Sequence, residues 1–187
     1  KIKENALERH IPIIMDDTLE VIDKYLTEKR PEKILEIGTA VGYSAMCFSE
    51  YLRDGGKIDT IERDEERYNI AVKNVELSNL NNITLIKGDA LDITITDKFD
   101  LIFIDAAKGK NKEFLDKFKS NLNENGYIII DNMDFHGLVG KSKTIEKRRL
   151  RSLVKKIENF IKYMEEQTEF KVTKIDKGDG LYLLERI

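Results

Sequence analysis

Acidic and amide side chains follow two apolar runs in the second half of the sequence. Asp105 lies in the run FDLIFIDA (99–106), and Asp131 and Asn132 end the run GYIIIDN (126–132). If these runs are neighbouring strands of one sheet, the three side chains converge. Two carboxylates and one amide suit Mg²⁺ or a similar hard divalent ion. The alternative is that Asp131 and Asn132 only cap a turn, which is common for these residue types.

A glycine-containing loop follows an earlier apolar run, in the sequence EIGTAVGYS (36–44). Its glycines allow a sharp turn and a close approach to a ligand. A dinucleotide fingerprint would need glycine where Ala40 and Tyr43 stand, and the Gly-Lys-Ser/Thr of a P-loop is absent. The acid before the first glycine, Glu36, suits a ligand with an ammonium or sulfonium group. A purely structural strand-to-helix turn would use the same glycines.

Two later runs also end in acids. Glu62 ends the run KIDTIE (57–62), where an acid can accept hydrogen bonds from a ribose diol. Asp89 and Ala90 end the next run, where a short polar side chain could meet a purine edge. Each acid alone is better explained as a helix cap or a first-turn acid. Together they form a series along one edge of a sheet. This combination indicates a ligand site far more specifically than any one acid does.

The elements that must position these residues alternate along the chain. Short runs rich in Ile and Leu are typical of buried parallel strands. Repeated strand–helix units indicate a parallel α/β sheet with right-handed crossovers, whose ligands bind beyond the carboxyl ends of the strands. The strands are predicted at 33–38, 57–62, 83–89, 99–106 and 126–132, and the helices between them at about 43–54, 64–79 and 109–123.

The tail of the chain has a different pattern. Residues 144–166 place apolar side chains three and four apart, which predicts a long amphipathic helix. Strands at about 169–175 and 180–187 follow, and the glycine-rich link between them predicts an antiparallel hairpin. The start, about 4–28, is expected to be mainly helical, with Pro12 near the opening of its second segment.

Composition bounds these predictions. A chain of 187 residues with 41% hydrophobic and 36% charged residues suits one soluble globular domain, 1–187, in which about 1–30 form a helical N-terminal segment. No apolar run approaches the ~18 residues of a membrane span. The one cysteine, Cys47, excludes an intrachain disulfide and a zinc site built on several thiolates, so we expect a cytoplasmic protein.

The net charge of −3 argues against a general nucleic-acid binder, but the charge is unevenly distributed. Residues 141–156 hold eight Lys or Arg residues and one acid, and the rest of the chain is correspondingly acidic. Such a basic stretch on an acidic body can bind an anionic partner. The alternative is a solvated helix face, the usual place of these residue types.

The motifs together resemble class I S-adenosylmethionine (SAM)-dependent methyltransferases. They are most similar to the cation-dependent O-methyltransferases that include catechol and caffeoyl-CoA methyltransferases. The pairing of DAAK with DN separates this group from metal-free methyltransferases. The resemblance implies SAM and Mg²⁺ or another divalent cation as cofactors, a Rossmann-like fold with a mostly parallel seven-stranded sheet and a C-terminal antiparallel hairpin, and a homodimer. The matching pieces are LEIGTAVGYSA (35–45), Glu62, GDA (88–90), FDLIFIDAAK (99–108), GYIIIDN (126–132) and GDGLYL (178–183).

The resemblance also implies a role for each matching residue. A metal-bound hydroxyl loses its proton easily, and a lysine ammonium is disfavoured beside a dication, so the implied metal and base fit methyl transfer to an oxygen. For Lys108 the alternative is a surface lysine that starts a helix. The implied roles are Glu36, Gly38, Tyr43 and Ser44 at the methionine end of SAM, Glu62 at its ribose, Asp89 and Ala90 at adenine, Asp105, Asp131 and Asn132 at the metal with Asp105 also beside SAM, and Lys108 as general base.

The acceptor is predicted from the tail. It resembles that of the bacterial tRNA 5-hydroxyuridine methyltransferases, which make 5-methoxyuridine at the wobble position. The 5-hydroxyl and 4-carbonyl of that base are vicinal oxygens that could chelate a metal as a catechol does. Our first hypothesis is therefore tRNA methylation, with the basic stretch near the acceptor entrance. The alternatives are a small catechol-like or caffeoyl-CoA-like acceptor and a non-catalytic SAM-binding protein. The candidate phosphate contacts are Lys141, Lys143, Arg148, Arg149 and Arg151.

Overall fold

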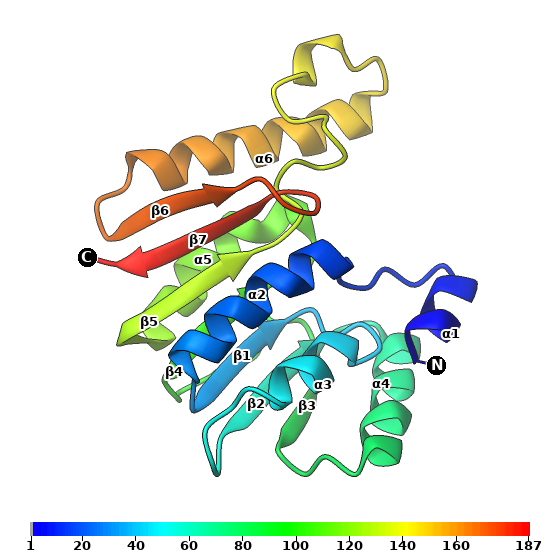
Figure 1. The fold of residues 1–187 in the computed structure, drawn as a ribbon. Helices are drawn as coiled ribbons and strands as arrows, with labels where there is room; N and C mark the ends of the chain where they lie inside the picture. Colours follow the sequence, from blue (N-terminus) through cyan, green and yellow to red (C-terminus); the bar gives the residue numbers. More distant parts are fainter. Residues whose placement is uncertain (1) are drawn as a thin grey trace.

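Seven strands form one sheet with the order β3-β2-β1-β4-β5-β7-β6 in the computed structural model, which describes residues 2–187 (Figure 1). The first five strands pair in parallel, and the last two form an antiparallel hairpin on the edge of β5. This confirms the predicted sheet. The strands are β1 (Lys33–Ile37), β2 (Lys57–Glu62), β3 (Ile83–Lys87), β4 (Phe99–Ile104), β5 (Leu122–Ile130), β6 (Phe170–Ile175) and β7 (Leu181–Arg186).

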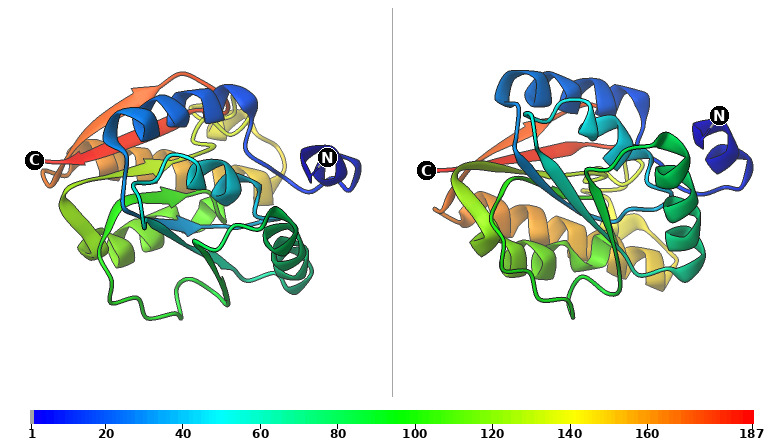
Figure 2. Two further views of the ribbon diagram at one scale, coloured as in Figure 1. Left: turned by 60° about the horizontal axis from the view of Figure 1, so that its bottom comes forward. Right: turned by 90° about the horizontal axis from the view of Figure 1, so that it is seen from below.

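Helices cover both faces of this sheet. Figure 2 shows α2 and α3 along one face and α5 and α6 along the other. No helix within residues 2–187 is long and apolar enough to cross a bilayer. The helices are α1 (Ile2–Glu8), α2 (Asp16–Lys29), α3 (Tyr43–Ser49), α4 (Glu65–Ser78), α5 (Asn111–Phe118) and α6 (Arg148–Glu166).

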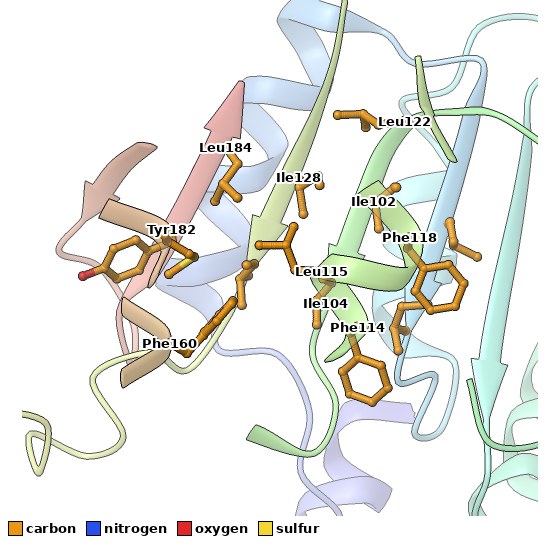
Figure 3. Close-up of a cluster of buried hydrophobic side chains, with 14 of the residues drawn as sticks. Ile102, Ile104, Phe114, Leu115, Phe118, Leu122, Ile128, Phe160, Tyr182 and Leu184 are labelled. Atoms are coloured by element: carbon orange, nitrogen blue, oxygen red, sulfur yellow. The ribbon is translucent and has the colours of Figure 1, made fainter. Parts of the chain in front are cut away.

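The core has two halves because successive side chains of a strand point to opposite faces. On β4, Leu101 and Phe103 pack toward α2 and α3, whereas Ile102 and Ile104 pack toward α5 and α6. Figure 3 shows the second half, in which side chains of β4, β5 and β7 meet those of the two helices. With both faces buried, the apolar runs of the sequence are continuous rather than alternating.

Several element bounds differ from the predicted ones. The helix expected at 43–54 ends at Ser49, and the one expected at 109–123 is helix α5 followed by a 3-10 turn. The long helix begins at Arg148 rather than 144, because a 3-10 turn over Ser142–Thr144 precedes it. Strand β5 begins at Leu122, with a register shift against β4 before the regular pairing.

The N-terminal segment is helical on either side of an extended link. Helix α1 ends at Glu8, and His10 has a φ of +53°, which the right-handed helix does not allow. The sequence predicts Pro12 near the start of the second helix. In the structure Pro12 lies in this link, before α2 begins at Asp16. The link between the two helices is therefore extended and partly exposed.

Candidate active site

A cavity of about 560 Å³ lies where the predicted ligand edge of the sheet should be. Its wall comes from the loops after β1, β2, β3, β4 and β5, together with the link between α1 and α2. This is the point at which the strand order reverses between β1 and β4, the usual binding site of open α/β sheets. The predicted residues that line it are Gly38, Tyr43, Ser44, Glu62, Asp89, Ala90, Asp105, Lys108 and Asn132.

The loop after β1 needs its first glycine because of a neighbouring strand. Gly38 has a φ of +107°, and a Cβ there would lie 2.2 Å from the backbone oxygen of Asp105. An L-residue would therefore be strained and would also collide with the loop after β4. Gly38 thus lets the cofactor loop and the predicted metal loop approach each other.

Glu36 is buried behind the cavity wall rather than in it, which corrects the expected direct place at the methionine end. Its carboxylate accepts hydrogen bonds from the Ser44 hydroxyl and, at 2.5 Å, from the Thr60 hydroxyl. Burial raises the pKa of Glu36 to about 7, against the lowering effect of these two bonds. Since Ser44 does line the cavity, Glu36 acts on the site by orienting this hydroxyl.

Glu62 is held at the end of β2 by backbone amides. Its Oε2 accepts from the Ala40 N–H at 2.8 Å and its Oε1 from the Asp64 N–H at 2.9 Å. Each carboxylate oxygen has a second lone pair. The side chain is therefore oriented and can still accept hydrogen bonds from a diol in the cavity.

The predicted adenine end is built from the turn after β3. The Asp89 Oδ1 accepts from the Leu91 N–H at 2.9 Å, and its Oδ2 lies 3.6 Å from the Nη1 of Arg63. Ala90 is buried beside it. Arg63 also lines the cavity, and the sequence analysis did not predict this contribution.

The strand pairing brings the predicted metal residues together. Ile104 of β4 pairs with Ile130 of β5, so Asp105 and Asp131 follow neighbouring positions at the same edge. The Lys108 Nζ donates to the Asp105 Oδ1 at 2.6 Å, and both side chains are largely shielded. The predicted base and one predicted metal ligand therefore form an ion pair on the cavity wall.

Asp131 is buried next to this pair. Its Oδ1 accepts from the Asn132 N–H at 2.6 Å, whereas its Oδ2 is buried and has no hydrogen-bond partner in the described part of the chain. Burial and the negative charge of Asp105 raise the pKa of Asp131 to about 7. A buried acceptor without a partner is unfavourable, and a bound cation would satisfy it.

This donor set fits a hard divalent ion. Residues 2–187 contain no cluster of three His, Cys, Asp or Glu side chains that could hold a metal. The residues that would hold an ion here are Asp105 and Asp131, through their carboxylates, and Asn132, through its amide oxygen. Oxygen donors in this combination suit Mg²⁺.

Other residues line the cavity that the sequence analysis did not select. Phe135 and His136 follow the predicted metal loop, with ring centroids 5.5 Å apart, and Asp179 reaches the wall from the β6–β7 turn. The aromatic side chains thus lie after DN and not between Asp105 and Lys108. The signals present in the sequence were the position of Phe135 and His136 after DN and the GDG motif around Asp179.

The basic stretch contributes no residue to the cavity wall, although α6 packs against the turn at Lys108–Lys110 that does line it. Its five predicted phosphate contacts are exposed, none of them lines the cavity, and none forms an ion pair with another residue from 2 to 187. Figure 1 shows the segment before α6 projecting from the body of the molecule. The expected place of this charge near the acceptor entrance stays a prediction. The five residues are Lys141, Lys143, Arg148, Arg149 and Arg151.

Comparison with known proteins identifies the family. The model of an O-methyltransferase family matches residues 26–187. The chain belongs to this family. It is a SAM-dependent O-methyltransferase with the class I methyltransferase fold.

Individual relatives of this methyltransferase agree with that assignment. A Staphylococcus aureus structure named a "putative caffeoyl-CoA O-methyltransferase" is 31% identical, with a TM-score of 0.92 over 99% of this chain and 90% of the other. A Bacillus cereus O-methyltransferase in complex with SAH is 25% identical, with a TM-score of 0.84 over 99% of this chain and 89% of the other.

One relative is named for a different reaction. A Saccharolobus solfataricus protein named "Probable cobalt-precorrin-6B C(15)-methyltransferase (decarboxylating)" is 34% identical over 135 residues, which are 70% of this chain and 68% of that protein. The Staphylococcus structure matches nearly the whole chain, so the match to O-methyltransferases extends over more of this enzyme. This places the enzyme in the caffeoyl-CoA methyltransferase group.

Proposed function

We propose that this enzyme methylates one hydroxyl of a small acceptor that carries two vicinal oxygens, as in a catechol or caffeoyl-CoA. The observation that carries the proposal is the unpartnered, buried Oδ2 of Asp131 beside the Asp105–Lys108 pair. Its neighbour Asn132 lines the same cavity as the residues expected around SAM. The Staphylococcus relative, named for caffeoyl-CoA, supports a small acceptor.

Each residue of this site then has a defined task. Asp105, Asp131 and Asn132 would hold a divalent ion, which stabilises a negatively charged acceptor oxygen when it is bound. Lys108, once neutral, would take the proton of the acceptor hydroxyl on Nζ. The loop after β1 and Glu62 would orient SAM so that oxygen, methyl carbon and sulfur lie in line, which is the main remaining requirement.

The proposal is tested by a comparison of acceptors. We would measure methyl transfer from SAM to catechol, to caffeoyl-CoA and to tRNA that carries 5-hydroxyuridine, each with Mg²⁺ and with EDTA. Turnover of a catechol acceptor that requires the metal is the expected result. Equal turnover in EDTA would contradict the metal role. Brisk tRNA methylation without catechol turnover would contradict the small acceptor.

tRNA is a second candidate acceptor because of the basic stretch. Its five exposed cations follow Asn132 in the chain, and none of them forms an ion pair with another residue from 2 to 187. An anionic polymer could contact them while one base enters the cavity. We place tRNA second because no residue of the stretch lines the cavity, and because the two O-methyltransferase structures compared above are named for caffeoyl-CoA or for no acceptor.

A further inference from the structure

The turn between β6 and β7 lies directly beside the loop that carries Asn132. Strand β7 pairs antiparallel with β5, and Ile130 at the end of β5 pairs with Tyr182 near the start of β7. The chain therefore leaves β5 at the point where the hairpin turn, with its GDG sequence (178–180), enters β7. The function proposed above assigns no task to this motif.

Three hydrogen bonds join the turn to the loop after β5. The Met133 N–H donates to the Gly180 backbone oxygen at 2.9 Å, and the Asp134 N–H donates to the Asp179 backbone oxygen at 2.7 Å. The His136 N–H donates to the Asp179 Oδ1 at 2.5 Å, and the Asp179 Oδ2 lies 3.6 Å from the His136 Nδ1. The Asp179 carboxylate is thus the one side chain of the turn that holds the aromatic part of the loop.

The loop that these bonds hold is in an unfavourable conformation. Asn132, Phe135 and His136 all have positive φ values, of +57°, +46° and +57°. Left-handed residues other than glycine cost free energy and persist only where their surroundings impose them. The bonds from the β6–β7 turn, including the one from the His136 N–H to the Asp179 carboxylate, are of the kind that can impose them.

The turn itself is also anchored to helix α2. The Gly178 N–H donates to the Asp17 Oδ2 of α2 at 3.0 Å, and a Cβ at Gly178 would lie 2.0 Å from the Thr18 hydroxyl. On the other side, a Cβ at Gly180 would lie 2.7 Å from the Asp134 Cγ. The hairpin turn is thus packed between α2 and the loop after β5, and little movement is open to it.

We infer that Asp179 is a positioning residue for the acceptor end of the cavity. It holds Phe135 and His136 over the cavity in their left-handed conformation and thereby also sets the backbone that orients Asn132. The inference rests on the proposed function, because it assigns this end of the cavity to the acceptor and the other end to SAM. Loss of the carboxylate should therefore affect the acceptor and leave SAM binding unchanged.

The test compares variants within one turn. In Asp179→Ala the His136 N–H loses its acceptor, whereas Asp179→Asn keeps a side-chain oxygen in the same place. Gly180→Ala keeps the Asp179 side chain but crowds Asp134 in the same loop, so it tests independently whether displacing this loop affects the acceptor if Asp179→Ala folds poorly. Asp176→Ala is the matched control, since Asp176 lies on the same hairpin, is exposed and, among residues 2–187, forms an ion pair with Lys174 alone.

Two readouts are expected to change together. With a catechol acceptor, Asp179→Ala should raise the acceptor KM about ten- to a hundredfold and leave the SAM KM within about twofold. Amide hydrogen exchange should become faster in a peptide covering 133–137, a result that needs neither acceptor nor metal. Gly180→Ala should show the same pattern, Asp179→Asn should recover most of the acceptor KM, and Asp176→Ala should behave as wild type.

Other results would overturn the inference. Unchanged exchange of 133–137 in Asp179→Ala would show that the carboxylate does not hold the loop. Equal increases in the KM values of SAM and acceptor would show a general structural role. If the wild-type enzyme methylates no catechol, the proposed function fails, and the exchange experiment still decides whether Asp179 holds the loop.

Discussion

Glu36 and Asp131 are buried carboxylates with similar pKa values and different surroundings. Burial raises the pKa of each to about 7. Glu36 has a hydroxyl donor on each oxygen, so its hydrogen bonds are satisfied within the protein. Asp131 has one oxygen without a partner in the described structure. At the residue scale, this difference separates a carboxylate that orients the cofactor loop from one that is suited to an added cation.

Glu36 should make stability depend on pH. Its pKa rises from 4.5 in the unfolded chain to about 7 in the folded one, so the unfolded chain loses this proton first. The contribution is complete below about pH 4.5 and is lost as the pH rises toward about 7, by roughly 3 kcal/mol. Glu36→Gln should remove this fall in the free energy of unfolding, measured by urea denaturation between pH 5 and 8.

The control for this experiment is Glu50→Gln, at an exposed position after α3. It should keep the wild-type pH dependence. Asp131 contributes a fall of the same sign to all three proteins, so only the difference between the curves is informative. Parallel curves for wild type and Glu36→Gln would show that Glu36 is not the titrating group.

Lys108 should be needed for chemistry and not for cofactor binding. Lys108→Met removes the Nζ that lies 2.6 Å from Asp105 and is expected to lower kcat by about a hundredfold or more. The affinity for SAM, measured by calorimetry, should stay within about twofold. Lys112→Met is the control, since Lys112 is exposed on α5 and pairs with Asp116. A near-normal kcat in Lys108→Met would exclude Lys108 as the base.

At the scale of elements, the site depends on loops that touch one another at the strand ends. The loop after β1 lies against the loop after β4 through Gly38, and the β6–β7 turn lies against the loop after β5. The parallel order of β1, β4 and β5 puts these loops side by side. A change in one loop should therefore affect the geometry of the next.

Gly38 provides a direct test of this contact. In Gly38→Ala the new Cβ would lie 2.2 Å from the Asp105 backbone oxygen, so both loops must move. We expect a loss of about 2–4 kcal/mol in the free energy of unfolding, measured by calorimetry. Gly55→Ala is the matched control, because Gly55 also has a positive φ, of +78°, but a Cβ there meets nothing within 4 Å.

The control separates backbone strain from collision. Gly55→Ala should cost only about 1 kcal/mol, the price of a left-handed conformation in an L-residue. Equal losses in the two variants would mean that the collision of the new Cβ with Asp105 adds nothing to the loss of stability.

At the scale of the whole molecule, the acids at the strand ends and the basic stretch occupy different parts of the fold. The acids at the strand ends surround the predicted cofactor and metal, whereas the basic stretch lies at the start of α6 and in the segment before it. The net charge of −3 therefore says little about the acceptor. The predicted homodimer and cytoplasmic location remain predictions.

Charge reversal in the basic stretch tests what this surface does. Arg148→Glu combined with Arg149→Glu should leave catechol turnover within about twofold, because neither side chain lines the cavity. If tRNA is bound, the same variant should weaken its binding and reduce the dependence of that binding on salt. Filter binding at several salt concentrations measures the second effect.

A second pair of reversals keeps the change in net charge constant. Lys24→Glu with Lys29→Glu alters exposed positions of α2 and should change neither catechol turnover nor tRNA binding. Unchanged tRNA binding in the arginine variant would show that the basic stretch is only a solvated face. A large loss of catechol turnover would show that it belongs to the small-acceptor site.

The sequence alone determined which segments along the chain form strands and helices. It also determined that the functional residues lie at strand ends. Apolar runs and their flanking residues are local features, so they predict β1 to β5, the hairpin, and the placing of Glu62, Asp105 and Asp131. The bounds of α3, α5 and α6 and the place of Pro12 differ from the predicted ones, because turns and side-chain contacts end these elements.

Only the tertiary structure decided which side chains face the cavity. Glu36 lies behind the wall, where the hydroxyl of Thr60, 24 residues away, donates to one of its oxygens. Asp179 holds His136 across 43 residues, a contact that exists only because β7 pairs with β5. The basic stretch lies outside the cavity wall, partly in the projecting segment before α6 and partly on α6 itself. Such relations depend on strand pairing between distant parts of the chain, and no local pattern in the sequence records them.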